Sequence, residues 1–274
     1  MTQIRLCTLS QGAGYLDLCG LYPHDLLALT CREITSLPLP AAAHAGSLGD
    51  HFRITRTDSD PDVLVICGET QRVTHAGSGM TAGLLIVDGN AGDHTGSEMS
   101  GGTVIVRGSA GDCLGVAMRG GMIRVMGDAG DWCGAAHAGR SQGMAGGAIL
   151  VWGNTGIETG SRMRRGLVAV RGNCGESSGA RMIAGSVLCL GSLGRHAGIG
   201  MKRGSIIAGA AGNILPGFRH AGFSDTTWLH LLKNWLQEHD FPIAGWQQGA
   251  SPMRFTGDHL ALGKGELIIH DIIE

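Results

Sequence analysis

The sequence has few aromatic residues, few lysines and no long apolar run. Aromatic residues make up 4% of the 274 residues, and Lys202, Lys233 and Lys264 are the only lysines. No apolar run approaches the roughly 20 residues that a bilayer-spanning helix needs. The formal net charge of -2 provides no bulk attraction to nucleic acid or to an anionic membrane. We therefore expect a soluble protein that binds neither.

The motifs of the common enzyme classes are also missing. The chain has no G-x-S-x-G elbow, no Walker loop, no H-E-x-x-H and no Rossmann fingerprint between a strand and a helix. The spacing G-x-x-G recurs so often that a single match to a nucleotide motif carries no information. The hexapeptide repeat of left-handed acyltransferase helices is absent as well. These absences predict a chain with no catalytic residues and no cofactor of its own.

Eight cysteines are present, but none form a C-x-x-C pair. An even number of cysteines indicates a disulfide framework in a short secreted chain. This chain is long, and its first residues, MTQIRLCTLS, do not have the pattern of a signal peptide. We therefore expect reduced thiols and a cytoplasmic location. Cys189 replaces the valine of other repeat units, which predicts a small buried hydrophobic residue there.

The sequence is rich in glycine, and most of its 48 glycines belong to a repeat between Met80 and Gly217. The seven units begin at Met80, Met99, Met118, Met144, Met163, Met182 and Met201. Glycine lies 3 and 16 residues after every methionine, and 9 and 12 residues after it in six of the seven units. The step is 19 residues throughout, except that seven extra residues follow Gly134. A period this strict indicates a repeat fold.

Each unit carries one short apolar segment between glycines, such as residues 84–87 and 104–106. Its length and its β-branched residues predict a strand. The fifth and seventh residues after methionine are apolar nearly throughout and the eighth varies, so they lie on opposite faces of the strand. One short strand cannot bury its inner face alone. Stacked units, about 4.8 Å apart, can do so.

The predicted fold class is therefore all-β, a single-stranded right-handed β-helix, or solenoid, of about seven 19-residue coils. The glycines would form tight corners with positive φ. A flexible glycine-rich segment is the alternative, but such segments lack a strict apolar register. The predicted organisation is an N-terminal cap over residues 1–60, the repeat domain over 61–220, and a C-terminal helix with terminal strands over 221–274.

Both ends of such a stack need covering, because exposed sheet edges invite aggregation. Residues 63–68 align with 84–89 at a spacing of 21, which predicts an atypical first coil. Residues 24–29 fit a strand or a short helix equally well. At the other end, residues 266–273 are typical of a final strand, which we expect to pair with 255–261.

Residues 226–238 have the pattern of an amphipathic helix, with Ser224 or Asp225 as N-cap. Its apolar stripe consists of Trp228, Leu231, Leu232, Trp235 and Leu236. We expect this helix to pack on the last coil as a cap. A separate helix that binds a partner is the alternative.

Candidate catalytic or metal-binding residues do not converge. His94 and His196 share a column, but with three or more coils between them they would lie more than about 10 Å apart, too far for one metal. Asp93, Asp112 and Asp131 recur in another column, followed later by Glu176. We interpret these acids as caps of turn backbone groups rather than as a catalytic pair. A free-standing sugar lyase or acyltransferase would need acids or histidines on adjacent coils.

Cations gather on the later units. They are Arg164, Arg165, Arg181, Arg195, Lys202 and Arg203. Stacking would concentrate them at one end, as a solvated surface or as a groove for a polyanionic ligand or an acidic partner. The insertion at residues 135–142 should bulge as a loop, and we expect its His137 and Arg140 to contact a partner.

The repeated motif M-x-x-G-x-(I/V)-x-V-x-G-x-x-G-x-x-x-G, as in residues 99–115, resembles that of the C subunit of formylmethanofuran dehydrogenases. It also resembles the related C-terminal domain of glutamate synthase large subunits, which stabilises a synthase. The stretch from Leu48 to Phe52, the overall length and the short N-terminal region favour the former family. The resemblance covers about residues 50–240.

Two complexes contain this kind of subunit. One is the archaeal tungsten or molybdenum dehydrogenase. The other is the bacterial formyltransferase/hydrolase complex of methylotrophs, which moves a formyl group between tetrahydromethanopterin and methylofuran and hydrolyses it to formate. Arginine richness with only three lysines favours the second.

The resemblance implies that the formyl chemistry and a catalytic metal lie in partner chains, an amidohydrolase-like A subunit and a formyltransferase D subunit. The C subunit would be a scaffold beside the B subunit, with no metal of its own. The basic residues would then hold the oligoglutamate tail of methylofuran.

Overall fold

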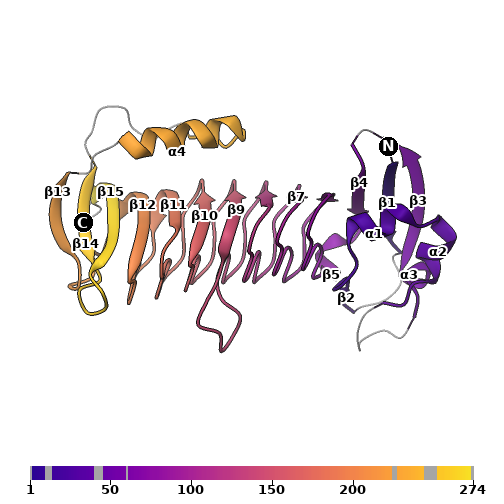
Figure 1. Cartoon of the computed structure of the whole chain (residues 1–274), viewed down its shortest axis with the longest axis horizontal. Helices are drawn as coiled ribbons and strands as arrows, with labels where there is room; N and C mark the ends of the chain where they lie inside the picture. The colour runs from indigo at the N-terminus through magenta and orange to yellow at the C-terminus, as the bar shows by residue number, and fades with distance from the viewer. Residues whose placement is uncertain are drawn as a thin grey trace.

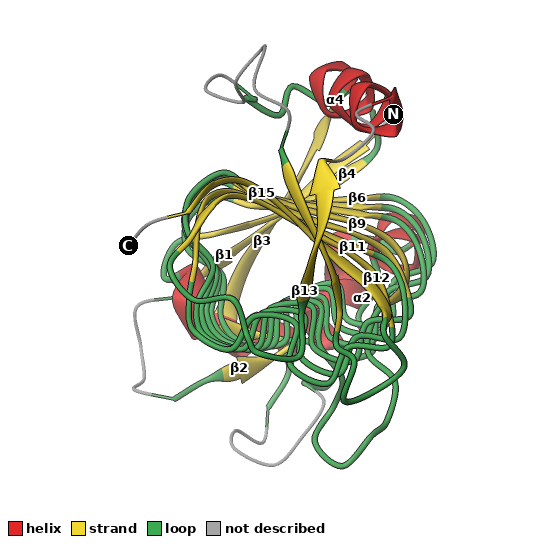
Figure 2. Cartoon of the chain, turned by 90° about the vertical axis from the view of Figure 1, so that its left-hand side faces the viewer, coloured by secondary structure: helices red, strands yellow, loops and turns green. Residues whose placement is uncertain are grey.

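The structure is a computed structural model that describes residues 2–9, 14–39, 46–59, 61–223, 227–243 and 252–272. Within these ranges the chain is mostly β with few helices, and a 13-stranded, mostly parallel sheet runs through it. The strands follow one another along the longest axis of the molecule (Figure 1). Seen along that axis, the turns of the chain lie one behind another around a common interior (Figure 2).

The middle of the sheet is a stack of parallel strands, one from each repeat. They are β4 (Val63–Cys67), β6 (Leu84–Val87), β7 (Thr103–Val106), β8 (Met122–Val125), β9 (Ala145–Val151), β10 (Arg165–Val170), β11 (Ser186–Leu193) and β12 (Arg203–Ala211). Equivalent repeat positions pair, so Leu85 lies beside Val104 and Val104 beside Ile123. A second ladder of single parallel bridges runs from Ala91 to Leu193. The repeat period is therefore the step from one coil to the next.

The interior of the stack consists of the columns that the sequence predicts. Every repeat methionine, from Met80 to Met201, has 0% of its surface exposed. In β6 the fifth and seventh residues, Leu85 and Val87, are buried, whereas Leu84 and Ile86 are half-buried. This confirms the predicted alternation. Aligned side chains thus form one continuous core along the stack.

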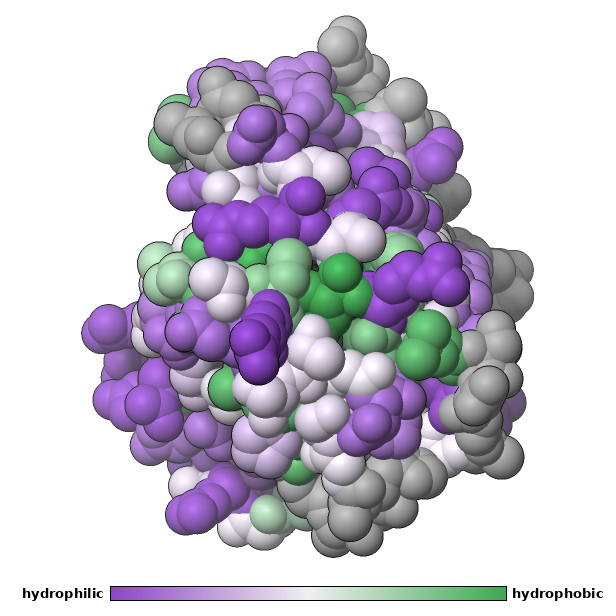
Figure 3. Space-filling model, turned by 90° about the vertical axis from the view of Figure 1, so that its right-hand side faces the viewer, coloured by the Kyte–Doolittle hydropathy of each residue, from purple (hydrophilic) through white to green (hydrophobic). Residues whose placement is uncertain are grey.

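At the N-terminal end, β1 (Thr2–Thr8) pairs in parallel with β4, and β3 (Phe52–Asp58) pairs antiparallel with the other edge of β1. The register Leu64 beside Leu85 confirms the spacing of 21. The smaller elements are β2 (Leu16–Asp17), α1 (Pro23–Ala28), α2 (Cys31–Ser36), α3 (Leu48–His51), the 3-10 turn η1 (Thr70–Arg72) and β5 (Val73–Thr74). Figure 3 shows this end, where hydrophilic side chains surround a smaller hydrophobic area. Arg53 and Arg56 on β3 are exposed, and such charges discourage edge pairing.

At the C-terminal end, β15 (Lys264–Ile272) pairs in parallel with β12, as one more strand of the stack. β14 (Met253–Gly257) pairs antiparallel with β15, and β13 (Arg219–Phe223) pairs antiparallel with β14. The predicted final strand and its pairing are confirmed, although the partner strand ends at Gly257. The parallel stack is thus bounded by antiparallel strands at both ends.

The helix α4 (Thr227–Glu238) is not an end cap, so that prediction was wrong. It lies along the outer face of the sheet, above the later strands (Figure 1). Its Leu229 and Leu236 are buried in a second core with Leu150, Leu188 and Ile207, outward residues of β9, β11 and β12. The predicted stripe also contains one error, since Leu231 is 69% exposed. The predicted N-cap residues, 224 and 225, lie outside the described residues.

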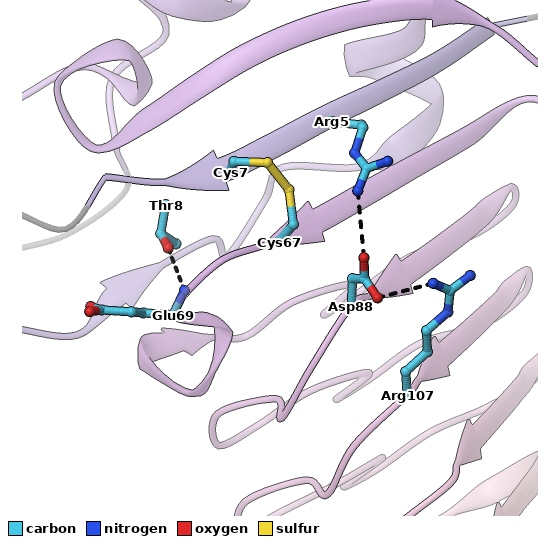
Figure 4. The surroundings of a disulfide bond; sticks show 7 residues. All are labelled: Arg5, Cys7, Thr8, Cys67, Glu69, Asp88 and Arg107. Carbon is cyan, nitrogen blue, oxygen red and sulfur yellow. Dashed lines mark hydrogen bonds and ion pairs between the residues drawn. A yellow bond between two sulfur atoms is a disulfide. The ribbon is translucent and has the colours of Figure 1, made fainter.

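The expectation that all thiols are reduced was also wrong. Cys7 and Cys67 form a disulfide between β1 and β4, across a sequence separation of 60. They are paired neighbours in the parallel register, with Cα atoms 4.4 Å apart. Beside the disulfide, Asp88 accepts hydrogen bonds from Arg5 and Arg107, at 3.5 and 3.0 Å (Figure 4). The other six cysteines are free, and Cys189 is buried as predicted.

None of the helices in the described ranges is long and apolar enough to cross a membrane. The proposed domain limits at residues 60/61 and 220/221 stay a prediction.

Candidate functional site

Two columns of side chains link successive coils. The oxygen Oδ1 of Asp93 accepts a hydrogen bond from the backbone N–H of Asp112 at 2.9 Å, Asp112 accepts one from Asp131 at 2.8 Å, and the column ends where Asp131 accepts one from Ile157. In the other column, Asn90 accepts one from Ser109 at 2.9 Å. These contacts confirm that the three aspartates bind turn backbone groups, and the same role for Glu176 stays a prediction.

In five of the seven coils, one corner has a left-handed backbone at three positions. Sixteen residues after methionine the residue is glycine, as at Gly96, where a Cβ would lie 2.4 Å from Ile123 Cδ1 in the interior. Positions 14 and 18 also have positive φ but carry side chains. Such φ values, 53° to 61°, occur at His94, Glu98, Cys113, Ala117, Trp132, Glu158, Arg162, Ser177, Arg181 and His196. None of these side chains is buried, so this corner presents a row of side chains on a strained backbone.

A pocket of 620 Å³ lies between this corner and the loop formed by residues 135–143. We call them the corner pocket and the insertion loop. The loop projects from the stack just before β9 (Figure 1), as predicted. The corner side chains that line the pocket include His94, Cys113, Trp132, Glu158, Arg162 and Arg181. All six occupy positions 14 or 18 of their coils.

A row of three stacked imidazoles connects the corner with the insertion loop. The ring of His94 stacks on that of His75, with centroids 4.7 Å apart, and on that of His137, 6.5 Å away. Carboxylates close both ends of the row, since Asp17 lies 3.1 Å from His75 Nδ1 and Glu98 lies 2.9 Å from His137 Nε2. Sequence reasoning missed this row. The spacing of 19 between His75 and His94 was the available signal, but it begins before the first complete repeat.

One arginine from each of the two following coils also holds the insertion loop. Arg162 donates a hydrogen bond to the carbonyl oxygen of Arg140, and Arg164 Nη1 donates one to Gln142 Oε1 at 3.2 Å. The side chain of His137 is itself paired with Glu98 of the same chain. Arg140 is exposed. Contact of these two residues with a partner stays a prediction.

The six predicted basic residues occupy different positions of their coils. Arg164, Arg165, Lys202 and Arg203 are exposed next to the methionine column, at the strand starts of β10 and β12. The exposed Lys264 lies opposite Arg203 in the backbone register of β12 and β15. Sequence reasoning missed this further cation because β15 follows the last repeat. Arg181 instead lines the corner pocket. Arg195 is exposed, in the column of Asp93.

The chemistry of the corner pocket is that of a binding surface. Burial, followed by Asp112, raises the pKa of the Cys113 thiol, which therefore stays protonated near neutrality. Burial and the neighbouring His75 lower the pKa of His94. A neutral thiol beside a neutral imidazole lacks the thiolate–imidazolium pair of a cysteine nucleophile. Among the described residues, no group of three or more His, Cys, Asp or Glu side chains is arranged to hold a metal ion.

Comparison with known proteins finds a solved chain that matches nearly all of this one. It is in the crystal structure of the formyltransferase/hydrolase complex FhcABCD from Methylorubrum extorquens, which was determined in complex with methylofuran. The match has a TM-score of 0.87 and 34% sequence identity, and it covers 97% of this chain and 98% of that chain. No protein-family model and no curated protein sequence matches.

Proposed function

The chain belongs to the family of formyltransferase/hydrolase complex subunits, and we propose that it is the non-catalytic C subunit of such a complex. The observation that carries the proposal is the end-to-end match, 97% of one chain on 98% of the other at 34% identity. The engaged acids of the coil corners and the protonated Cys113 support a structural role.

The proposed structure for this role is a single-stranded right-handed β-helix of about seven coils. Its partners would be the A, B and D subunits in the cytoplasm. The complex would transfer a formyl group between tetrahydromethanopterin and methylofuran and release formate, with the catalytic metal in the A subunit. In this role the chain contributes a rigid surface, because two ladders of backbone hydrogen bonds join successive coils and columns of side chains add further bonds between several of them.

The assembly can be tested by affinity purification of the tagged chain from its source organism, followed by mass spectrometry. We expect the A, B and D subunits to co-elute in a fixed ratio, and formyl transfer to depend on the chain when the complex is rebuilt from its parts. Elution as an active monomer would exclude this structural role. A tungsten or molybdenum dehydrogenase, or a glutamate synthase, among the partners would identify a different complex.

We also propose that the cations next to the methionine column bind the oligoglutamate tail of methylofuran. Arg164, Arg165 and Arg203 are exposed, and Lys264 lies beside Arg203. A row of cations with a fixed spacing suits a chain of carboxylates.

The triple variant Arg164→Gln/Arg165→Gln/Arg203→Gln should weaken binding of an oligoglutamate peptide by the assembled complex. Arg171→Gln is the matched control, because Arg171 is exposed on the same coil at the far end of β10. Equal affinity of the triple variant and the wild type would remove this role, while leaving the proposed assembly to the purification experiment.

A further inference from the structure

The corner pocket contains opposite charges that do not meet. Glu158 and Arg181 both line it, from neighbouring coils. In the described part of the chain, neither of these two side chains has a hydrogen-bond or ion-pair partner. The guanidinium of Arg162, which also lines the pocket, has one contact, to the carbonyl oxygen of Arg140. Opposite charges that stay apart across a pocket leave room for a ligand with both a cationic and an anionic group.

The left-handed backbone of this corner carries large side chains at the pocket. Trp132, Glu158 and Arg181 have φ values of 58°, 54° and 53°, which glycine adopts without strain and large residues rarely do. The same conformation recurs at Ala117 and Ser177, so it belongs to the coil. The side chains that it carries at the pocket differ from coil to coil and give the pocket its chemistry.

The remaining lining adds an apolar face and neutral polar groups. Trp132 is 38% exposed and offers its indole ring to the pocket. The Nδ1 atom of His94 is buried and has no hydrogen-bond partner among the described residues. The pocket volume of 620 Å³ is in the range of small-molecule sites. These features select a small, amphipathic ligand over a large or purely ionic one.

We propose that the corner pocket binds a zwitterionic ligand of the size of an amino acid or a dipeptide. Arg181 and Arg162 bind its carboxylate, Glu158 binds its ammonium group, and its apolar part packs on Trp132. The insertion loop closes one side of the site, because His137 and Gly139 also line the pocket. This proposal does not depend on the one made for the oligoglutamate tail, because it uses Glu158, Arg162 and Arg181 and none of Arg164, Arg165 and Arg203.

Three probes that differ only in charge test the proposal with the full-length chain. L-phenylalanine has both charges, N-acetyl-L-phenylalanine lacks the ammonium group and L-phenylalaninamide lacks the carboxylate. Binding is followed by nuclear magnetic resonance at the Trp132 indole N–H, assigned from the Trp132→Phe spectrum. We expect saturable shifts with L-phenylalanine and affinities about tenfold or more lower for the two blocked forms, because each loses a charge-assisted hydrogen bond.

Variants on the protein side complete the test. Glu158→Gln and Arg181→Gln should each weaken L-phenylalanine binding about tenfold or more, and Arg181→Lys should restore part of the affinity. Arg195→Gln is the control, since Arg195 is exposed one coil further along but does not line the pocket. Thermal unfolding checks that every variant is folded.

Two results would overturn the proposal. One is equal binding of the three probes, or no binding of any of them by the folded wild type. The other is a failure of the assembled complex to bind L-phenylalanine. That result would indicate that a segment of a partner protein fills the corner pocket. The proposed assembly survives either result, because it is tested by purification.

Discussion

At the scale of single residues, two kinds of glycine support the coils. Glycines 3 residues after methionine have positive φ, as predicted, and so do those 16 residues after it except Gly217. Glycines at 9 and 12 are required instead by close approach of the preceding coil, since a Cβ on Gly111 would lie 2.2 Å from Asp93 Oδ1. The sequence predicted the first kind from turn geometry. The second became clear only with the side-chain columns in place.

Gly121 combines both constraints, which makes it a sensitive position. Its φ is +83°, and a Cβ would lie 2.7 Å from both Gly102 O and Met99 Cε. Gly121→Ala should lower the free energy of unfolding by about 1 to 3 kcal/mol or more, measured by urea denaturation. Gly139→Ala is the matched control, because Gly139 has φ +76° with nothing within 4 Å of a Cβ. Equal losses would show that backbone strain alone sets the cost.

His94 should make stability depend on pH. Burial, then His75 and His137, lower its pKa below the ordinary 6.5, so the unfolded chain binds this proton more readily than the folded one. Stability should therefore fall as the pH drops through 6.5 and level off below the folded-state pKa. His94→Asn, whose side chain tolerates positive φ, should give a shallower decline in urea denaturation. An unchanged pH profile would contradict the prediction.

At the scale of elements, α4 shows what an amphipathic pattern leaves undecided. The apolar stripe predicted a buried face, and Leu236 is indeed 0% exposed. The pattern does not say which apolar surface covers that face. The two faces differ in burial rather than in sequence, because Leu150 of β9 is fully buried whereas Leu84 and Ile86 of β6, also apolar, are half-buried. Strands buried on both sides require a second layer.

The contribution of α4 can be measured with two leucines of the same helix. Leu236→Ala should cost about 2 to 5 kcal/mol of unfolding free energy, since it leaves a cavity against the sheet. Leu231→Ala should change it by no more than about 0.5 kcal/mol, because that side chain is 69% exposed. Chemical denaturation of both variants distinguishes a helix packed on the sheet from one that packs only on a partner protein. Similarly small losses of unfolding free energy in both variants would favour the second.

At the scale of the whole molecule, the periodic part and the C-terminal strands were predictable, whereas the strand β1 and the corner pocket were not. Equivalent positions of the repeat pair with one another, so the buried methionine column follows from the spacing alone. The N-terminal strand β1 lies outside the repeat, so its pairing with β4 was not predicted. The disulfide between Cys7 and Cys67 depends on that pairing and was missed for the same reason. The corner pocket was missed for a related reason. Its side chains vary from coil to coil, and only the insertion loop turns that surface into a pocket.

The disulfide should stabilise the N-terminal end against the stack. It closes a loop across 60 residues, for which the chain-entropy model gives roughly 4 kcal/mol as an upper value. Cys7→Ala/Cys67→Ala should lower the midpoint of thermal unfolding under non-reducing conditions, and dithiothreitol should lower that of the wild type alone. Cys19→Ser, at an exposed free cysteine, is the control. A double variant as stable as the wild type would show that the β1–β4 pairing suffices.

Because the strands stack in parallel register, the length of the molecule depends on the number of coils. Every coil repeats the same contacts with the next, so one unit more or fewer would move the two antiparallel ends by one strand spacing, about 4.8 Å, without altering either end. The distance between the two ends is thus set by the number of coils. A family built on this plan can change that distance in fixed increments and leave both antiparallel ends unchanged.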